Sequence, residues 1–139
     1  MREILFRGKR IDNNEWIYGD LLHPTEDDKD YYIEDFTQKK NNCHAVIPET
    51  IGQYTGVMDA NKNPIVDQDV VSIPYRDMSG FIEYQKALVF WDNERYRWCV
   101  KFMDGEVLTL EDVIDPSSPI DFVVEDNIID NKKLAEVWE

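Results

Sequence analysis

The chain has 139 residues and a formal net charge of −14 at pH 7. A chain of this length is the size of one ordinary domain and can bury a sufficient core without cross-links. The charge repels phosphate backbones and so argues against general nucleic-acid binding, and the longest apolar run, at residues 87–91, falls far short of a membrane-spanning helix.

The N-terminus and the cysteines both favour a protein of a reducing, cytosolic compartment. Residues 1–10 are interrupted by charges where an export signal requires an apolar core. Cys43 and Cys99 lie far apart in the sequence and form neither a Cys-x-x-Cys pair nor a disulfide framework. We therefore expect two free thiols in a reducing compartment.

The first half of the chain reads as short strands separated by polar turns. Residues 3–9 and 16–22 flank a polar turn and predict an opening hairpin. The next strands are expected at residues 31–36 and 69–73, with a short apolar stretch at 45–47 that Pro48 stops and a looser stretch at 74–80.

The sequence also predicts a long hairpin with strands at residues 86–91 and 95–102 around a turn at 92–94. Alternation places Tyr96, Trp98, Val100 and Phe102 on one face, which we expect to be core. The first of its strands is apolar on both faces, which predicts a central place in the sheet. The opposite face of the second strand carries the basic residues, with one cysteine among them: Arg95, Arg97, Cys99 and Lys101.

The C-terminal third predicts two more strands, at residues 107–110 and 122–124, and a short helix within residues 130–138. Asp130 or Asn131 suits the helix N-cap, and Leu134, Val137 and Trp138 form an apolar stripe. So short a helix is marginal alone, so we expect it to dock on its own domain or on a neighbouring subunit.

Three stretches, which together span nearly the whole chain, resemble the YopX-like family of phage and prophage proteins. They are Arg-Glu-Ile-Leu-Phe-Arg-Gly at residues 2–8 with Trp-Ile-Tyr-Gly at 16–19, Ile-Gly-Gln-Tyr-Thr-Gly at 51–56, and Asn-Ile-Ile-Asp-Asn at 127–131. The middle stretch is the most specific, because in the family it leads through a turn into a Glu-Gly-Asp-hydrophobic-Val strand start. Here Asp-Gln-Asp-Val-Val at residues 67–71 stands in that place.

Two departures from the family pattern affect the backbone. The turn at residues 61–64 contains no glycine, so Asn61 or Asn63 is expected to take a left-handed conformation there. Gln68 replaces the usual glycine before Asp69, which implies either an ordinary backbone or some strain at that residue.

The resemblance implies a phage or prophage accessory protein that works in the bacterial cytoplasm, and it brings no catalytic residue with it. Together with the strand pattern it predicts one YopX-like domain over residues 1–139, mainly β and α+β at the margin. The architecture we expect is an N-terminal hairpin, a small SH3-like barrel or sheet, and the short C-terminal helix. The SH3-like part is an analogy of fold only.

A possible binding surface comprises Tyr54, Arg95, Arg97 and Lys101. The stretch at residues 53–56 favours a tight turn that holds Tyr54 in the core over a binding role. The basic stripe of the other three residues suits phosphate contact in principle, but such stripes more often solubilise a sheet face or pair with carboxylates.

Two chemical sites are weighed and disfavoured. His23 lies near Glu26, Asp27, Asp28 and Asp30, yet their spacing matches no metal-binding loop, so a solvated acidic loop is the better interpretation. Cys43 and His44 are adjacent, and neighbours on an extended strand point to opposite faces, so a nucleophile and base pair is not favoured. We expect no metal and no cofactor.

Three functional hypotheses remain open. The leading one is a non-enzymatic, homo-oligomeric module that binds a host or phage protein. The alternatives are an acidic DNA mimic that inhibits a host nucleic-acid enzyme, motivated by the carboxylates crowded into residues 104–139, and a metal-dependent hydrolase that uses His23, His44 and nearby acids.

Overall fold

The computed structural model describes residues 3–76, 78–114, 117 and 120–138. Arg2 of the first resembling stretch and Asp77 of the looser stretch lie outside the described residues. The chain divides into two compact units, Met1–Gly56 and Val57–Glu139. That the two units make up one domain over residues 1–139 stays a prediction. Among the described residues, no helix is both long and apolar enough to cross a membrane.

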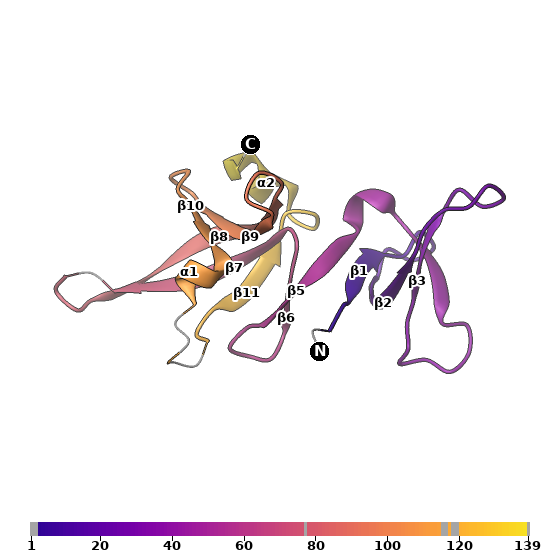
Figure 1. Cartoon of the computed structure of the whole chain (residues 1–139), viewed down its shortest axis with the longest axis horizontal. Coiled ribbons are helices and arrows are strands. Elements are labelled where there is room, and N and C mark those ends of the chain that lie inside the picture. Colours follow the sequence, from indigo (N-terminus) through magenta and orange to yellow (C-terminus); the bar gives the residue numbers. More distant parts are fainter. Residues whose placement is uncertain (1–2, 77, 115–116, 118–119, 139) are drawn as a thin grey trace. The chain divides into compact units, whose positions relative to one another are not determined.

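The first unit is an antiparallel sheet whose strands follow in the order β4-β3-β2-β1-β5 (Figure 1). The predicted opening hairpin is confirmed, with Phe6 opposite Gly19 and Lys9 opposite Trp16. Its core contains Ile17, Ile33 and Val46. The elements are β1 Phe6–Lys9, β2 Trp16–Leu22, β3 Tyr31–Glu34, β4 Cys43–Val46, the 3₁₀ helix η1 Pro48–Thr50, and β5 Gly52–Met58, which crosses into the second unit.

The second unit contains a five-stranded antiparallel sheet in the order β10-β9-β8-β7-β11. Its core includes Val71 and Ile73 of β7, Ala87 and Val89 of β8, and Val100 of β9. The elements are β6 Pro64–Val66, β7 Asp69–Arg76, β8 Ile82–Asp92, β9 Arg97–Phe102, β10 Val107–Thr109, α1 Leu110–Val113, β11 Val123–Asn127, α2 Lys132–Ala135 and the 3₁₀ helix η2 Glu136–Trp138.

The mainly β class is confirmed, and the sheet of the second unit is open. Its described strands end at β10 on one edge and β11 on the other, so they do not close a barrel. The central place predicted for the first strand of the long hairpin is also confirmed, because β8 lies between β7 and β9.

The short C-terminal helix is confirmed and docks on its own unit. The Asn131 side chain caps α2 by accepting a hydrogen bond from the Leu134 N–H. At the other end, the Trp138 indole Nε1–H donates to the Lys101 carbonyl over 2.7 Å, which ties the segment to β9.

The prediction that Tyr96 belongs to the core is wrong. The turn of the long hairpin extends to Tyr96, whose N–H donates to the Asp92 carbonyl. Tyr96 has φ 55° and its side chain is 79% exposed, because the strand alternation begins only at Arg97. From there Val100 and Phe102 are buried as predicted, but so is Cys99 on the other face.

The left-handed residue in the turn between β5 and β6 is Lys62, with φ 67°, so the expectation for Asn61 or Asn63 is wrong. The reason lies in Asp59, whose Oδ1 accepts the N–H groups of both asparagines. These two hydrogen bonds fix the backbone on either side and leave the reversal to Lys62.

Gln68 has φ 72°, in the left-handed region where the family pattern has glycine. Its N–H donates to the Val89 carbonyl over 2.9 Å, and its own carbonyl accepts the Ile128 N–H over 3.1 Å. Next to it, the buried Asp69 carboxylate accepts the Val66 N–H over 2.8 Å. These bonds hold the turn into β7 in a conformation that costs a side-chain-bearing residue about 1 kcal/mol.

We expect Gln68→Gly to raise the free energy of unfolding of the second unit by roughly 0.5–1 kcal/mol, because the relief of a positive φ exceeds the entropic cost of glycine. The matched control is Gln53→Gly in β5, where φ is not positive and glycine should destabilise. The measurement is chemical denaturation of both variants. A loss of stability in Gln68→Gly would contradict the strain.

Candidate protein-binding arm

The three basic residues of the predicted surface all lie at or near β9. Arg95, in the turn before it, donates from Nη1 to the Asp92 carboxylate over 2.7 Å, and this hydrogen bond raises the pKa of Arg95. Arg97 Nη1 lies 3.9 Å from the Glu111 carboxylate. The two arginines are therefore balanced by carboxylates of their own unit, in contacts that are largely exposed.

Tyr54 lies in the first unit and is only 6% exposed. It belongs to β5, so the expected tight turn at residues 53–56 is wrong, whereas the expected burial of its side chain is confirmed. Burial, and secondarily the charge of Glu3, raise the pKa of its phenol. Tyr54 thus lines the interior of the first unit.

The acidic loop after β2 is organised by its own hydrogen bonds. The Tyr32 hydroxyl donates to Asp28 Oδ2 over 2.5 Å, which lowers the pKa of Asp28 and raises the pKa of Tyr32 to about 12. The His23 ring packs against Tyr31. The described residues contain no group of three or more histidine, cysteine and acidic side chains placed to hold a metal ion.

The Cys43 and His44 pair sits on β4, opposite Glu34 and Ile33 respectively. Successive strand residues point to opposite faces, so the thiol and the imidazole diverge. Cys43 is exposed and Cys99 is buried, and both thiols are free. Burial raises the pKa of Cys99 and makes it the less reactive of the two thiols.

A more prominent feature is the outer part of the β7–β8 hairpin, residues 73–86, which we call the arm. The pairing of β7 with β8 continues to Arg76 opposite Ile82, but β11 pairs with β7 only up to Ser72. On the other side, the pairing of β8 with β9 ends at Ala87 opposite Phe102. The arm therefore extends away from the rest of its unit as a two-stranded ribbon (Figure 1).

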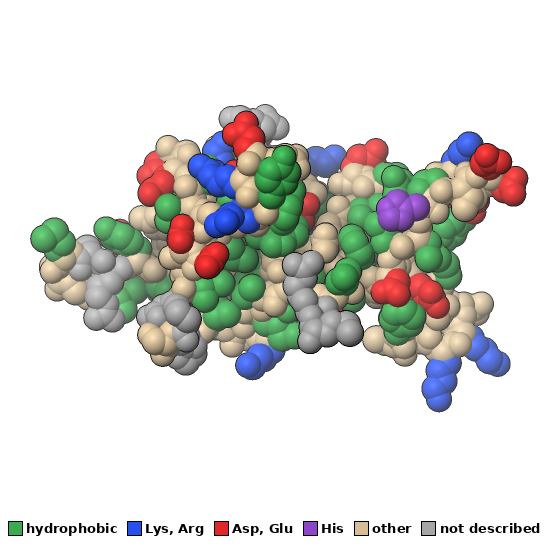
Figure 2. Space-filling view, in the orientation of Figure 1, with side chains coloured by type: hydrophobic (Ala, Val, Ile, Leu, Met, Phe, Trp, Pro, Cys, Tyr) green, Lys and Arg blue, Asp and Glu red, His purple; other side chains and the backbone are tan. Residues whose placement is uncertain are grey.

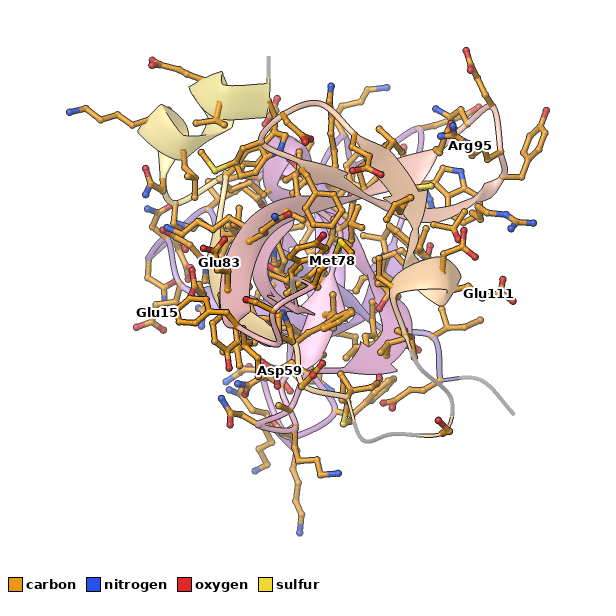
Figure 3. The ribbon with its side chains drawn as sticks, turned by 90° about the vertical axis from the view of Figure 1, so that its left-hand side faces the viewer. Glu15, Asp59, Met78, Glu83, Arg95 and Glu111 are labelled. Atoms are coloured by element: carbon orange, nitrogen blue, oxygen red, sulfur yellow. The ribbon has the colours of Figure 1, made fainter. Side chains whose placement is uncertain are left out.

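The arm exposes large apolar side chains along its length and at its tip (Figure 2). Met78 is fully exposed and lies at the tip, in the centre of the view along the arm in Figure 3. The exposed set comprises Tyr75, Met78, Phe81, Ile82 and Tyr84. Alternation and register put Ile82 and Tyr84 on the face of Pro74, and put Tyr75 on the face of Glu83.

A hollow of about 450 Å³ lies where the arm leaves the sheet. It forms because β9 ends at Phe102 while β8 continues outward. Its lining residues are Tyr84, Gln85, Lys86, Phe102, Met103 and Asp104.

The arm and its supporting strands are close to neutral. Residues 70–103 contain five Lys and Arg against four Asp and Glu, whereas the whole chain carries −14. The strong negative charge of the protein is therefore located outside this part of the chain, which favours contact with another protein here.

The family model described as YopX protein matches residues 5–114, well over half of the chain and parts of both units. The chain belongs to the YopX protein family. The search of curated proteins found no match to the chain.

The arm was missed in the sequence, where residues 74–80 read as a looser stretch and the hairpin was expected to begin at Lys86. In the structure β7 runs through Pro74 and Tyr75, and β8 begins at Ile82. The signal was present, because Ile73 and Tyr75 alternate on one strand and Ile82 and Tyr84 on the other. Pro74 obscured this signal, because a proline argues against a central strand and occurs in sheets at edges, at strand starts and at bulges.

Asp59 is a buried carboxylate of the second unit, and such groups are candidates for function. Its two oxygens accept three backbone N–H groups, from Asn61, Asn63 and Val124, over 2.8–2.9 Å. Burial alone would raise its pKa, but the donors outweigh burial and hold the pKa below its ordinary value. The carboxylate therefore joins the β5–β6 turn to β11, which is a structural role.

We expect Asp59→Asn to lower the free energy of unfolding near pH 7 by about 1.5–3 kcal/mol, because an amide nitrogen would face a backbone N–H. A carboxyl group whose pKa is lowered in the folded state stabilises the fold at pH values above its ordinary pKa of about 4. This stabilisation is lost as the pH falls through the folded-state pKa. The variant should thus lose less stability in acid than the wild type. The measurement is chemical denaturation between pH 7 and 3, with the exposed Asp121→Asn as the control. If Asp59→Asn and the wild type lost the same free energy of unfolding on acidification, the structural role of the Asp59 carboxylate would be contradicted.

Proposed function

We propose that this protein is a non-enzymatic phage or prophage accessory protein of the bacterial cytoplasm, which binds proteins through the arm. Its partners are copies of itself and a host or phage protein. One observation carries the proposal: five large apolar side chains are exposed on a ribbon that projects from its unit.

Exposed apolar surface of this kind is costly in water unless something covers it. Burial is worth roughly 25 cal/mol per Å² of apolar surface, so aromatic and methionine side chains contribute strongly to interfaces. Tyrosine, phenylalanine and methionine are also the residue types enriched in protein interfaces. The arm concentrates all three within residues 75–84.

The arm supports protein binding over DNA mimicry. A mimic depends on ordered carboxylates, such as the exposed Glu111 and Asp112 of α1, and has no need of an apolar ribbon. A protein-binding module accounts for the near-neutral charge of residues 70–103 and for the acidity elsewhere, which keeps the protein soluble.

The test compares capture of proteins from nuclease-treated bacterial lysates, with and without phage induction, by three tagged forms. These are the wild type, the arm variant Tyr75→Ser with Met78→Ser, and the control Tyr96→Ser with Met58→Ser, which changes the same residue types at exposed positions off the arm. Circular dichroism checks that each form is folded.

We expect one protein to be retained by the wild type and the control and to be reduced at least about tenfold with the arm variant, because buried aromatic and apolar anchors dominate binding energy. Equal retention by the arm variant would overturn the role of the arm. Recovery of the bait alone from every lysate would overturn the external partner.

A further inference from the structure

We propose that the outer edge of β8, residues 82–86, pairs with the same edge of a second copy of this chain. The two strands run antiparallel about a two-fold axis at Tyr84 and join the sheets of two second units. This deepens the homo-oligomeric part of the proposed function and rests on it.

The edge is open in the described part of the chain. Residues 82–86 pair with β7 on their inner side, from Ile82 opposite Arg76 to Lys86 opposite Ser72. On their outer side the pairing with β9 stops at Ala87, and all five residues are exposed. Alternate residues of such a strand direct their N–H and C=O groups outward, where they form a template for another strand.

The opposite edge of the arm is protected, and the β8 edge is not. Pro74 lies in the arm segment of β7, and a proline cannot donate a hydrogen bond to a neighbouring strand. Prolines within sheets stand where the missing N–H would face away from the paired strand, so Pro74 blocks the outer edge of β7. Residues 82–86 read Ile-Glu-Tyr-Gln-Lys and contain no proline.

Among axes at the three central residues of the segment, 83–85, the side chains favour one register. Antiparallel residues that lie opposite each other share a face, so a two-fold axis must pass through a residue that faces its own copy. An axis at Glu83 would set two carboxylates against each other. An axis at Gln85 would place Glu83 of the second copy beside Ala87, where β9 already lies.

An axis at Tyr84 avoids both conflicts. It sets Tyr84 against Tyr84, Glu83 against Gln85, and Ile82 against the aliphatic stem of Lys86, with no like charges directly opposite. Beyond Ile82 the incoming strand must leave the pairing, because β9 occupies the position beside Ala87. The hollow lined by Phe102 and Met103 lies at that point and can receive the second copy's Phe81.

The local charge is compatible with a second copy at this edge. Two molecules that each carry −14 repel one another, so a stable contact has to use a part that is near neutral. Residues 70–103 meet that condition with five basic and four acidic residues. In the antiparallel arrangement, the acidic parts of the two second units, outside residues 70–103, also lie at opposite ends of the paired ribbon.

The first experiment is disulfide trapping in full-length protein with Cys43→Ser, which leaves only the buried Cys99 of the native thiols. Directly opposite strand residues have Cβ atoms about 4.5–5.5 Å apart, close to disulfide geometry. We expect Tyr84→Cys to cross-link with itself, and Glu83→Cys to cross-link with Gln85→Cys when the two variants are mixed. Tyr75→Cys, exposed on β7, is the control that should not cross-link.

The second experiment tests the register by charge. In Gln85→Glu, the new carboxylate of each copy lies opposite Glu83 of the other copy, so two pairs of carboxylates face each other. Self-association measured by analytical ultracentrifugation should weaken several-fold. The double variant Glu83→Gln with Gln85→Glu exchanges the two residues and should restore association to the wild-type level.

The outcomes separate this inference from the proposed function. A dimer by light scattering that gives no Tyr84→Cys cross-link, or that ignores Gln85→Glu, overturns the edge pairing and leaves oligomerisation through another surface. A strict monomer at every concentration overturns both the pairing and the homo-oligomer, while arm-dependent capture of another protein would still stand.

Discussion

Unequal strand length is the constraint on which the functional account depends. β8 has eleven residues, whereas its neighbour β9 has six, and β11 covers only the first part of β7. The inner half of the β7–β8 hairpin is therefore the centre of a five-stranded sheet, and the outer half is a ribbon of two strands. A ribbon of that kind is only marginally stable by itself in water, so the arm gains most from a partner that covers its apolar side chains and its open edge.

Two buried carboxylates organise the base from which the arm projects. Asp59 collects three backbone N–H groups and joins the β5–β6 turn to β11, while Asp69 accepts the Val66 N–H and closes the turn into β7. The positive φ of Gln68 between β6 and β7 is held by its bonds to Val89 and Ile128. These bonds hold the start of β7 against β8 and the segment after β11, at the end of the sheet away from the arm.

Local sequence signals were enough for much of this fold. The opening hairpin, the central β8 and the capped C-terminal helix follow from alternation, polar turns and the Asn131 cap, all of which act between near neighbours. The errors arose in turns and at strand ends, where the hydrogen bonds that form, and not residue type alone, decide the backbone conformation. Lys62 takes the left-handed conformation because of what Asp59 binds, and Tyr96 is exposed because the Asp92 turn is longer than its composition suggests. The arm was missed because Pro74 obscures the alternation of Ile73 and Tyr75. Its open edge depends on the relative lengths of β8 and β9, which neither strand reveals alone.

The most direct measurement is hydrogen–deuterium exchange of the backbone amides of residues 82–86 as a function of protein concentration. Amides of this segment that point away from β7 have no partner strand within the described chain, and they gain one only when a second copy pairs with the edge. The account expects these amides to be protected at high concentration and to exchange rapidly on dilution, while the amides bonded to β7 change little. Rapid exchange at every concentration would contradict it.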